Sequence, residues 1–406
     1  MTTTTPDTPV LDFDHHSVRT AHHRDEVLAE VSRHPIFYTE ANGGYWVVTS
    51  HDLTRVVLRD PQNFSSLKDE DGSGGVTIPT MVGPRLLPAE VDAPYHRTLR
   101  RILAPFFQRS AVERMRPAIE TLTREAIDRV ILKREFDVAT DIASVVPART
   151  IVEYLGFPES ERVAFISSIH AALDVMPHAA DPTWAGRPEL VEGMHALGHA
   201  IEVINDLIAE RRARPTEDLV SFIAANREVP DEHIMWIIFT LLVGGIENPA
   251  AMISNSLLYL AVDDALRQRL IADPSLIPAA CEELMRHITP GVSLARNVTQ
   301  DVEIGGVNLR TGDRILLWLP GPNHDCSVFH QPAQVDIDRP TCPHLAFGDG
   351  PHVCPGATLF RVQFEFLLTE MLRRIPYYTV DLDRVRRYDD AATMCGFKSL
   401  PARTNL

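Results

Sequence analysis

The chain has 406 residues, of which 45% are hydrophobic, and it carries a net charge of −16 at neutral pH. So acidic a balance argues against a nucleic-acid partner, because such a protein needs a basic face that displaces phosphate counterions. The longest nearly continuous apolar run, residues 234–246, is too short to cross a bilayer, and the Thr- and Pro-rich start lacks the layout of a signal peptide. We therefore expect no membrane span and a cytoplasmic protein.

The composition shows no break that would mark a linker between domains, and we find no internal repeat. Residues 1–12 have the composition of a disordered N-terminus, so we expect one large domain over residues 13–406. The five cysteines are irregularly spaced and odd in number, which favours reduced thiols over a disulfide framework.

The first part of the chain contains a strand candidate at residues 45–49 and a short helix that stops at Asp60-Pro61. A loop rich in Gly and Asp follows from 65 to 88, and its apolar end includes Val82 and Leu86. We interpret it as a mobile flap over a pocket, since long loops of this kind are commonly functional. A second loop, at 176–188, is a candidate for a substrate entrance.

Pro94 marks the start of a helix in which His96 and Arg100, four residues apart, share one face. A cationic pair on one face favours an anionic ligand. Farther along, Glu283 and Arg286 lie one helical turn apart and predict a structural ion pair. The segment 296–307 predicts a hairpin with a Gly-Gly turn.

An apolar helix begins near Ile234 and contains an unusual insertion, Gly244-Gly245-Ile246-Glu247-Asn248-Pro249. Two interpretations are open. The helix passes closely by a flat group, where the glycines leave room and Pro249 frees a carbonyl, or it simply ends at the glycines.

The most informative stretch is residues 347–356, in which one thiol is surrounded by glycines, prolines and a histidine. Gly348 and Gly350 predict a tight loop, and an apolar helix begins at Ala357, so Cys354 lies in a loop at a helix start. Backbone N–H groups and the helix dipole favour a thiolate there, which suits a soft ligand of haem iron. An alternative is a structural zinc site made by the four soft ligands Cys342, His344, His352 and Cys354.

Phe347, Gly350, Cys354 and Gly356 match the pattern Phe-x-x-Gly-x-x-x-Cys-x-Gly, and here the chain resembles the cytochrome P450 superfamily, in its soluble bacterial form. The central-helix glycines with the carboxylate that follows, the Glu-x-x-Arg pair, Arg296 and the last turn at 396–401 resemble further family motifs in the family's order. The resemblance implies a mainly α P450 fold with a large helical part and a small β-rich part. Haem would lie between the central helix and the cysteine loop.

The resemblance also implies the roles of individual residues. Cys354 would ligate iron, and haem b would be held by His96, Arg100, Arg296, Phe347, Gly348, His352, Cys354 and Gly356. Proton delivery would involve Gly245, Glu247 and Asn248, the last of which stands where the family usually has threonine. A substrate pocket would be lined by Val82, Leu86, Val243, Gly244, Val292, Leu294 and Met394.

The implied activity is a monooxygenase that inserts one oxygen atom from O2 into a lipophilic small molecule, by hydroxylation or epoxidation, in secondary metabolism. No flavin or iron–sulfur segment is evident in the sequence, so electrons from NAD(P)H would arrive through a separate ferredoxin and ferredoxin reductase. Arg109, Arg114 and Arg116 are candidates for their docking face. A peroxide-using peroxygenase and a non-catalytic haem-thiolate ligand-binding protein remain as alternatives.

Overall fold

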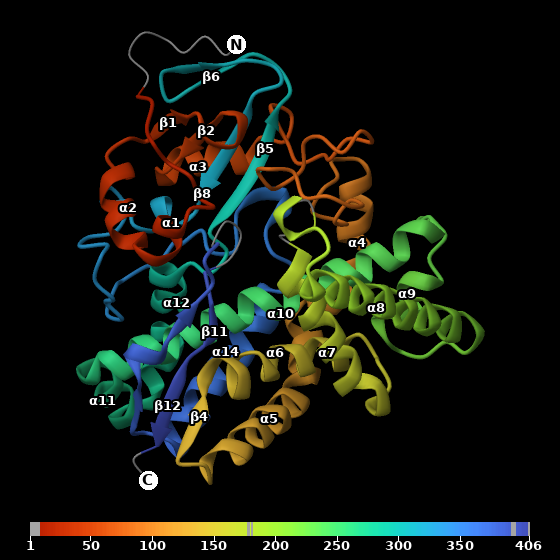
Figure 1. Cartoon of the computed structure of the whole chain (residues 1–406), viewed down its shortest axis with the longest axis vertical. Coiled ribbons are helices and arrows are strands. Elements are labelled where there is room, and N and C mark those ends of the chain that lie inside the picture. The colour runs from red at the N-terminus through yellow and green to blue at the C-terminus, as the bar shows by residue number, and fades with distance from the viewer. Residues whose placement is uncertain (1–8, 177–178, 180–181, 391–394, 405–406) are drawn as a thin grey trace.

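The computed structural model describes residues 9–176, 179, 182–390 and 395–404. It has a large helical part and a smaller β-rich part, which occupy opposite ends of the molecule in Figure 1. The N-terminal helices are α1 (Val18–His22), α2 (Arg24–Val31), α3 (His51–Arg59) and α4 (Tyr95–Phe107). The helical part is built from α5 (Arg109–Ile131), α6 (Val145–Tyr154), α7 (Glu159–Val175), α8 (Pro188–Ala213) and α9 (Leu219–Ala224). The remaining helices are α10 (Asp231–Val262), α11 (Asp264–Ala272), α12 (Ile277–Ile288), α13 (Pro320–Asn323) and α14 (Ala357–Arg374).

The main sheet has five strands in the order β1 (Ile36–Thr39), β2 (Tyr45–Val48), β8 (Arg314–Trp318), β5 (Ser293–Val298) and β3 (Phe64–Ser65). Within it β2 and β8 are parallel, and the other pairs are antiparallel. A three-stranded sheet contains β4 (Glu135–Asp137), β12 (Pro401–Thr404) and β9 (Tyr378–Val380). Two-stranded pairs are formed by β6 (Val302–Ile304) with β7 (Val307–Leu309), and by β10 (Arg386–Arg387) with β11 (Phe397–Ser399).

The predicted strand at 45–49 is β2, and the short helix after it is α3, which ends directly before Asp60. The predicted hairpin is present but is displaced toward the C-terminus. Its strands are β6 and β7, joined at Gly305 and Gly306, whose φ angles of 60° and 78° explain the two glycines. Arg296 belongs to β5 instead, and β5 pairs with β8 and β3.

Helix α10 is the central element of the helical part, and it runs without a break through both glycines and Pro249. The interpretation that the helix ends at the glycines is therefore wrong. Two glycines and an internal proline cost about 5 kcal/mol in helix propensity. Each buried apolar side chain contributes about 1.5–3 kcal/mol, and α10 buries many: its first half packs into one hydrophobic cluster and its second half into another. Packing therefore outweighs propensity.

Among the described helices, α10 alone is long and apolar enough to cross a membrane. More than half of its most apolar window is buried inside the protein, at 56%. The apolar residues of α10 therefore form the core, as its packing into the two hydrophobic clusters also indicates.

Residues before the expected domain boundary at residue 13 take part in the fold. Val10 forms a bridge with Tyr38, and the N–H group of Leu11 donates to the Tyr38 carbonyl at 2.9 Å. Residues 1–8 lie outside the described residues, as does part of the predicted entrance loop at 176–188. The loop at 65–88 begins at Ser65, the second residue of β3. Within the loop, the buried Nζ of Lys68 donates to the carbonyls of Met81 and Gly83, each at 2.6 Å.

Candidate functional site

The loop that carries Cys354 is a tight turn placed directly before α14. Gly348 and Gly350 have φ angles of 71° and 68°, a left-handed conformation that side chains other than glycine rarely adopt. The N–H group of Cys354 donates to the Phe347 carbonyl at 2.9 Å, which closes the loop. Gly356 caps α14, so the thiol lies at the positive end of an 18-residue helix.

Opposing effects act on the Cys354 thiol. Burial outweighs the other effects and raises the pKa of this thiol above its ordinary value, although the N–H groups of Gly356 and Ala357 and the charges of Arg100 and Arg361 act to lower it. The thiol lies deep in the protein yet keeps accessible surface, as a side chain on the wall of an internal cavity does. The thiol alone therefore favours its protonated form, and a metal that takes the sulfur as a ligand would displace this proton.

The structure contradicts the zinc alternative. His344 contacts Glu282, with 3.1 Å between Nε2 and Oε2, and Cys342 lies 3.6 Å from the Glu283 carboxylate. His352 instead stacks on His96, with ring centroids 3.8 Å apart. Within the described ranges, no group of three or more His, Cys, Asp or Glu side chains has the geometry of a metal site.

The predicted cationic residues converge beside the cysteine loop from three parts of the chain. His96 and Arg100 come from α4, Arg296 comes from β5, and His352 comes from the turn at Gly350–His352. Burial, with the neighbouring arginines, lowers the pKa of His96 to about 4 and that of His352 to about 3. Burial also lowers the pKa of Arg296 to about 10.

With these pKa values the two histidines are neutral at neutral pH, and the charge of the cluster comes from Arg100 and Arg296, which lack a carboxylate partner in an ion pair among the described residues. Arg296 is 3% exposed, and its one hydrogen bond goes to the Ala295 carbonyl. The nearby acid Asp92 accepts from Ser65 and from the Ser66 N–H group. Because an unpaired buried charge is costly, the cluster favours a bound dianion such as the two propionates of haem.

The two glycines of α10 have different roles. A Cβ atom added to Gly244 would meet nothing within 4 Å, so the helix presents bare backbone there. A Cβ atom on Gly245 would lie 2.7 Å from Cγ1 of Ile151, so this glycine allows α10 to pack against α6. The expectation that both glycines clear a flat ring is therefore wrong for Gly245.

Glu247 and Asn248 follow these glycines on α10. Burial, with a smaller effect of Asp174, raises the pKa of Glu247 to about 7. Burial, Asp174 and Glu247 together raise the pKa of Tyr388 above its ordinary range. Sequence reasoning missed Asp174 and Tyr388, because they lie on α7 and after β10, where no spacing relates them to Glu247.

Asn248 has a buried amide oxygen, Oδ1, without a hydrogen-bond partner in the described structure. A Cβ atom on Gly291 would lie 3.4 Å from this oxygen, so the amide faces the segment between α12 and β5. Pro249 has no N–H group and leaves the Gly245 carbonyl without its usual helical donor.

The predicted pocket residues divide into several groups. Val292 is buried, Val243 and Leu86 are half-buried, and Leu294 packs against the hydrophobic cluster of the main sheet. Val82 is 67% exposed on the loop at 65–88, and Met394 lies outside the described residues. The loop at 65–88 and the first turns of α10 border a cavity of about 300 Å³.

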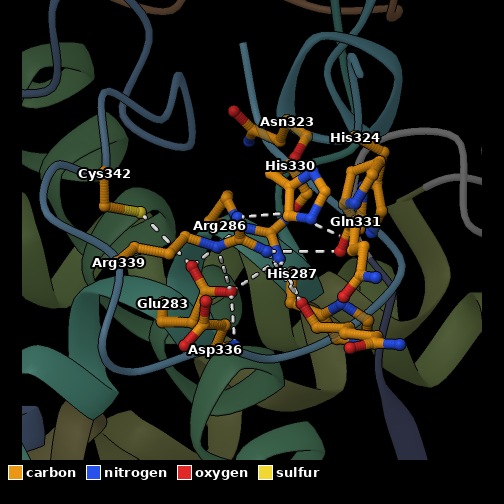
Figure 2. Close-up of polar contacts among 12 residues, drawn as sticks. Glu283, Arg286, His287, Asn323, His324, His330, Gln331, Asp336, Arg339 and Cys342 are labelled. Carbon is orange, nitrogen blue, oxygen red and sulfur yellow. Dashed lines mark hydrogen bonds and ion pairs between the residues drawn. The ribbon is translucent and has the colours of Figure 1, made fainter. Parts of the chain in front are cut away.

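The predicted ion pair is present and fully buried (Figure 2). Arg286 donates to both oxygens of Glu283, from Nη2 at 2.7 Å and from Nε at 2.8 Å. Arg339, which sequence reasoning missed, donates to the same carboxylate at 2.9 Å. Burial would raise the pKa of Glu283, but these donors outweigh it and hold the pKa below its ordinary value. The network links α12 to the chain that approaches the cysteine loop.

The observed donor set fits haem. Cys354 offers a soft sulfur, Arg100 and Arg296 offer charges without a carboxylate partner, and α10 presents bare backbone at Gly244. The fold and these residues fit the haem-thiolate class of protein, in which a cysteine thiolate would hold the iron of a flat, dianionic prosthetic group.

Comparison with known proteins agrees with this class. The family model for cytochrome P450 matches residues 18–402. The mycinamicin IV hydroxylase/epoxidase of Micromonospora griseorubida is 30% identical over 374 residues, which are 88% of each chain. The nocardicin C N-oxygenase of Nocardia uniformis subsp. tsuyamanensis is 33% identical over 342 residues, which are 82% of each chain.

Solved structures are similar over nearly the whole chain. CYP101J2 superposes with a TM-score of 0.84 at 27% identity and full coverage of both chains. HmtN, a post-tailoring hydroxylase of himastatin biosynthesis, superposes with a TM-score of 0.81 at 29% identity, covering 96% of this chain and 100% of its own. The chain belongs to the cytochrome P450 family, and it is an enzyme of the P450 monooxygenase class with the P450 fold.

Proposed function

We propose that the protein is a haem-thiolate monooxygenase that inserts one oxygen atom from O2 into a lipophilic small molecule of secondary metabolism. Hydroxylation or epoxidation is the proposed reaction, and a cytoplasmic location goes with it. The names of the relatives support this substrate class, since they describe a mycinamicin hydroxylase/epoxidase, a nocardicin C N-oxygenase and a himastatin hydroxylase. The observation that carries the proposal is the ionisable carboxyl of Glu247 beside the bare backbone of Gly244.

In the proposed site, haem b is held by Cys354 through iron and by His96, Arg100, Arg296 and His352 through its propionates. Phe347, Gly348 and Gly356 would contact it through the loop that they form around Cys354. When bound, haem supplies O2 activation, which the electron-donating thiolate favours. The residues of the chain supply the cationic edge, the ligand and a route for protons.

Glu247 is suited to handle protons at neutral pH because its pKa is near 7. The amide of Asn248 can donate a hydrogen bond and orient water, but it cannot supply a proton. We therefore assign proton supply to Glu247 and water positioning to Asn248. Val243, Gly244, Val292 and Leu86 remain the proposed substrate contacts.

Electrons are proposed to come from NAD(P)H through a ferredoxin and its reductase. Of the three candidate docking arginines, Arg116 is paired with Glu113, with 2.7 Å between Nε and Oε2. Arg114 donates to the Ser110 carbonyl, which leaves its charge unneutralised. The proposed docking surface therefore rests on Arg109 and Arg114.

The test is an isotope experiment with a surrogate ferredoxin system and a panel of lipophilic metabolites first screened by spectral binding. We expect one labelled oxygen atom from ¹⁸O₂ in the product and about one NAD(P)H consumed per product. Turnover with hydrogen peroxide alone, without dependence on the ferredoxin, would favour a peroxygenase. Spectral binding without any product under either condition would favour the non-catalytic alternative.

A further inference from the structure

Asp349, five residues before Cys354, is the most heavily bonded side chain of the cysteine loop. Its Oδ2 atom accepts from Nε of Arg55 at 3.0 Å and from Nε of Arg59 at 2.8 Å. Its Oδ1 atom accepts from Nη2 of Arg59 at 3.1 Å and from the Gly350 N–H group at 2.7 Å. Four donors therefore hold one carboxylate, two of them in the fork of a single guanidinium.

Both arginines belong to α3, which meets the approach to Cys354 at both of its ends. At the start of α3, Nε2 of His51 lies 2.9 Å from the Pro343 carbonyl. At its end, a Cβ atom on Gly350 would lie 2.4 Å from the Leu58 carbonyl, so loop and helix are in direct contact. Helix α3 therefore braces residues 343–350 along its length.

The ion pairs of Asp349 with Arg55 and Arg59, here called the clamp, lie within the turn that leads to Cys354. Asp349 is between Phe347, whose carbonyl accepts from the Cys354 N–H group, and the turn at Gly350–His352 that leads to Cys354. A shift of Asp349 must therefore move one or both of these supports of the sulfur. The side chain of Asp349 is 20% exposed, so its ion pairs are partly shielded from water.

We propose that Arg55 and Arg59 position the iron ligand Cys354 by clamping Asp349, which makes these three side chains positioning residues for the haem-thiolate bond. The inference rests on the proposed function, in which Cys354 ligates haem iron. Loss of the clamp loosens the loop and weakens the N–H donors that Gly356 and Ala357 direct at the sulfur. With fewer donors, the sulfur becomes more electron-rich and is more readily protonated and lost as a thiolate ligand.

A simple charge effect on the iron gives a different pattern. Asp349→Asn removes a negative charge and, by charge alone, would raise the iron reduction potential, whereas Arg59→Gln would lower it. Loosening of the loop lowers the potential in both variants. The sign of the change in Asp349→Asn therefore separates the two explanations.

The experiment uses the haem-loaded full chain and compares Asp349→Asn, Arg59→Gln and Arg59→Lys with the wild type. The matched control is Asp301→Asn, because Asp301 also accepts from one arginine, Arg310, and from one backbone N–H group. Asp301 directly precedes β6, at the outer end of the β-rich part in Figure 1. The measurements are the iron reduction potential and the rate at which the reduced carbon monoxide complex loses its thiolate-type Soret band.

We expect this loss to be about three- to tenfold faster in Asp349→Asn and Arg59→Gln, with a lower potential in both. Arg59→Lys should recover part of the difference, and Asp301→Asn should match the wild type. Unchanged rates, or a raised potential in Asp349→Asn, would overturn the clamp. If Asp349→Asn does not fold, the rate of band loss in Arg59→Gln decides, since both explanations lower its potential. A wild type that itself lacks the thiolate band would instead overturn the proposed function.

Discussion

At the scale of single residues, the carboxyl of Glu247 has the most direct consequence for activity. With its pKa near 7, the group is largely protonated below neutral pH and ionised above it. A proton supplied by this carboxyl therefore becomes scarcer as the pH rises through about 7.

Glu247→Gln should lower the rate of product formation at neutral pH by about tenfold or more, because the amide cannot supply a proton. In the wild type the rate should fall above the pKa of Glu247, and this limb should be absent in the variant. The measurement is the rate of product formation against pH with a saturating surrogate ferredoxin system. A variant with the wild-type profile would show that the proton takes another route.

At the residue scale, a motif that fixes both residue type and position predicted where Cys354 lies, in a tight glycine loop directly before a helix. Residue type alone says less about position. Val82 is apolar but exposed, because an apolar side chain is not obliged to be buried. Asp174 and Arg339 carry no local signal, since their partners are brought to them only by the fold.

At the scale of elements, α10 shows how two adjacent glycines serve different contacts. Gly245→Ala should destabilise the protein by about 1–2 kcal/mol, because overpacking against Ile151 exceeds the gain of about 1 kcal/mol in helix propensity. Gly244→Ala is the matched control, since its added methyl group meets no protein atom.

The two glycine variants should separate in two measurements, the melting temperature and the Soret spectrum. Gly245→Ala should lower the melting temperature and leave the spectrum unchanged. Gly244→Ala should perturb the spectrum with little loss of stability, because its backbone is proposed to face haem. A perturbed spectrum in Gly245→Ala together with a lower melting temperature in Gly244→Ala would show that the roles of the two glycines are exchanged.

His16 joins three segments that are distant in the sequence. Its Nδ1 atom lies 2.8 Å from the Asp390 carboxylate and its Nε2 atom lies 2.7 Å from the Ile78 carbonyl, so both nitrogens donate when the ring is protonated. Burial acts against protonation, while Asp390, Ile78 and Asp14 favour it and raise the pKa of His16.

This raised pKa predicts a pH dependence of stability. The contacts of protonated His16 with Asp390 and Ile78, here called the His16 bridge, stabilise the folded protein fully below the ordinary pKa of 6.5. This stabilisation is lost as the pH rises through the folded-state pKa of His16. The difference in melting temperature between the wild type and His16→Phe should therefore be larger at about pH 6 than at about pH 8.5. His23→Phe, at an exposed histidine, is the control and should show a much smaller change. A difference in melting temperature between the wild type and His16→Phe that grows with pH would contradict the His16 bridge.

At the scale of the whole molecule, the mainly helical P450 fold was predicted correctly from five short motifs in the family's order. Tertiary packing determined the extent of α10 and the position of the hairpin, which local sequence patterns do not fix. Propensity alone would have ended α10 at Gly244, and two clusters of buried side chains keep it helical. The hairpin near Arg296 was displaced because β5 pairs with β8, a partner that no local pattern identifies.

The cationic cluster ties the helical part to the β-rich part through the proposed haem. Arg296→Leu should speed haem transfer to apomyoglobin by about tenfold, because one charge-assisted propionate contact is lost. Arg314→Leu on the adjacent strand is a matched control: Arg314 is also largely buried, but it donates to the carbonyls of Gly75 and Thr77. Both variants should lower the melting temperature, and equal haem-transfer rates in the two would remove Arg296 from the propionate site.

The central claim is that Cys354 is the thiolate ligand of haem iron, and one spectrum tests it directly. Carbon monoxide added to the reduced wild-type protein should give the red-shifted Soret band of a thiolate-ligated haem. The same treatment of Cys354→Ser should give no such band, although haem can still bind through the cationic cluster. A wild type without the band, or a Cys354→Ser variant that retains it, would contradict the account.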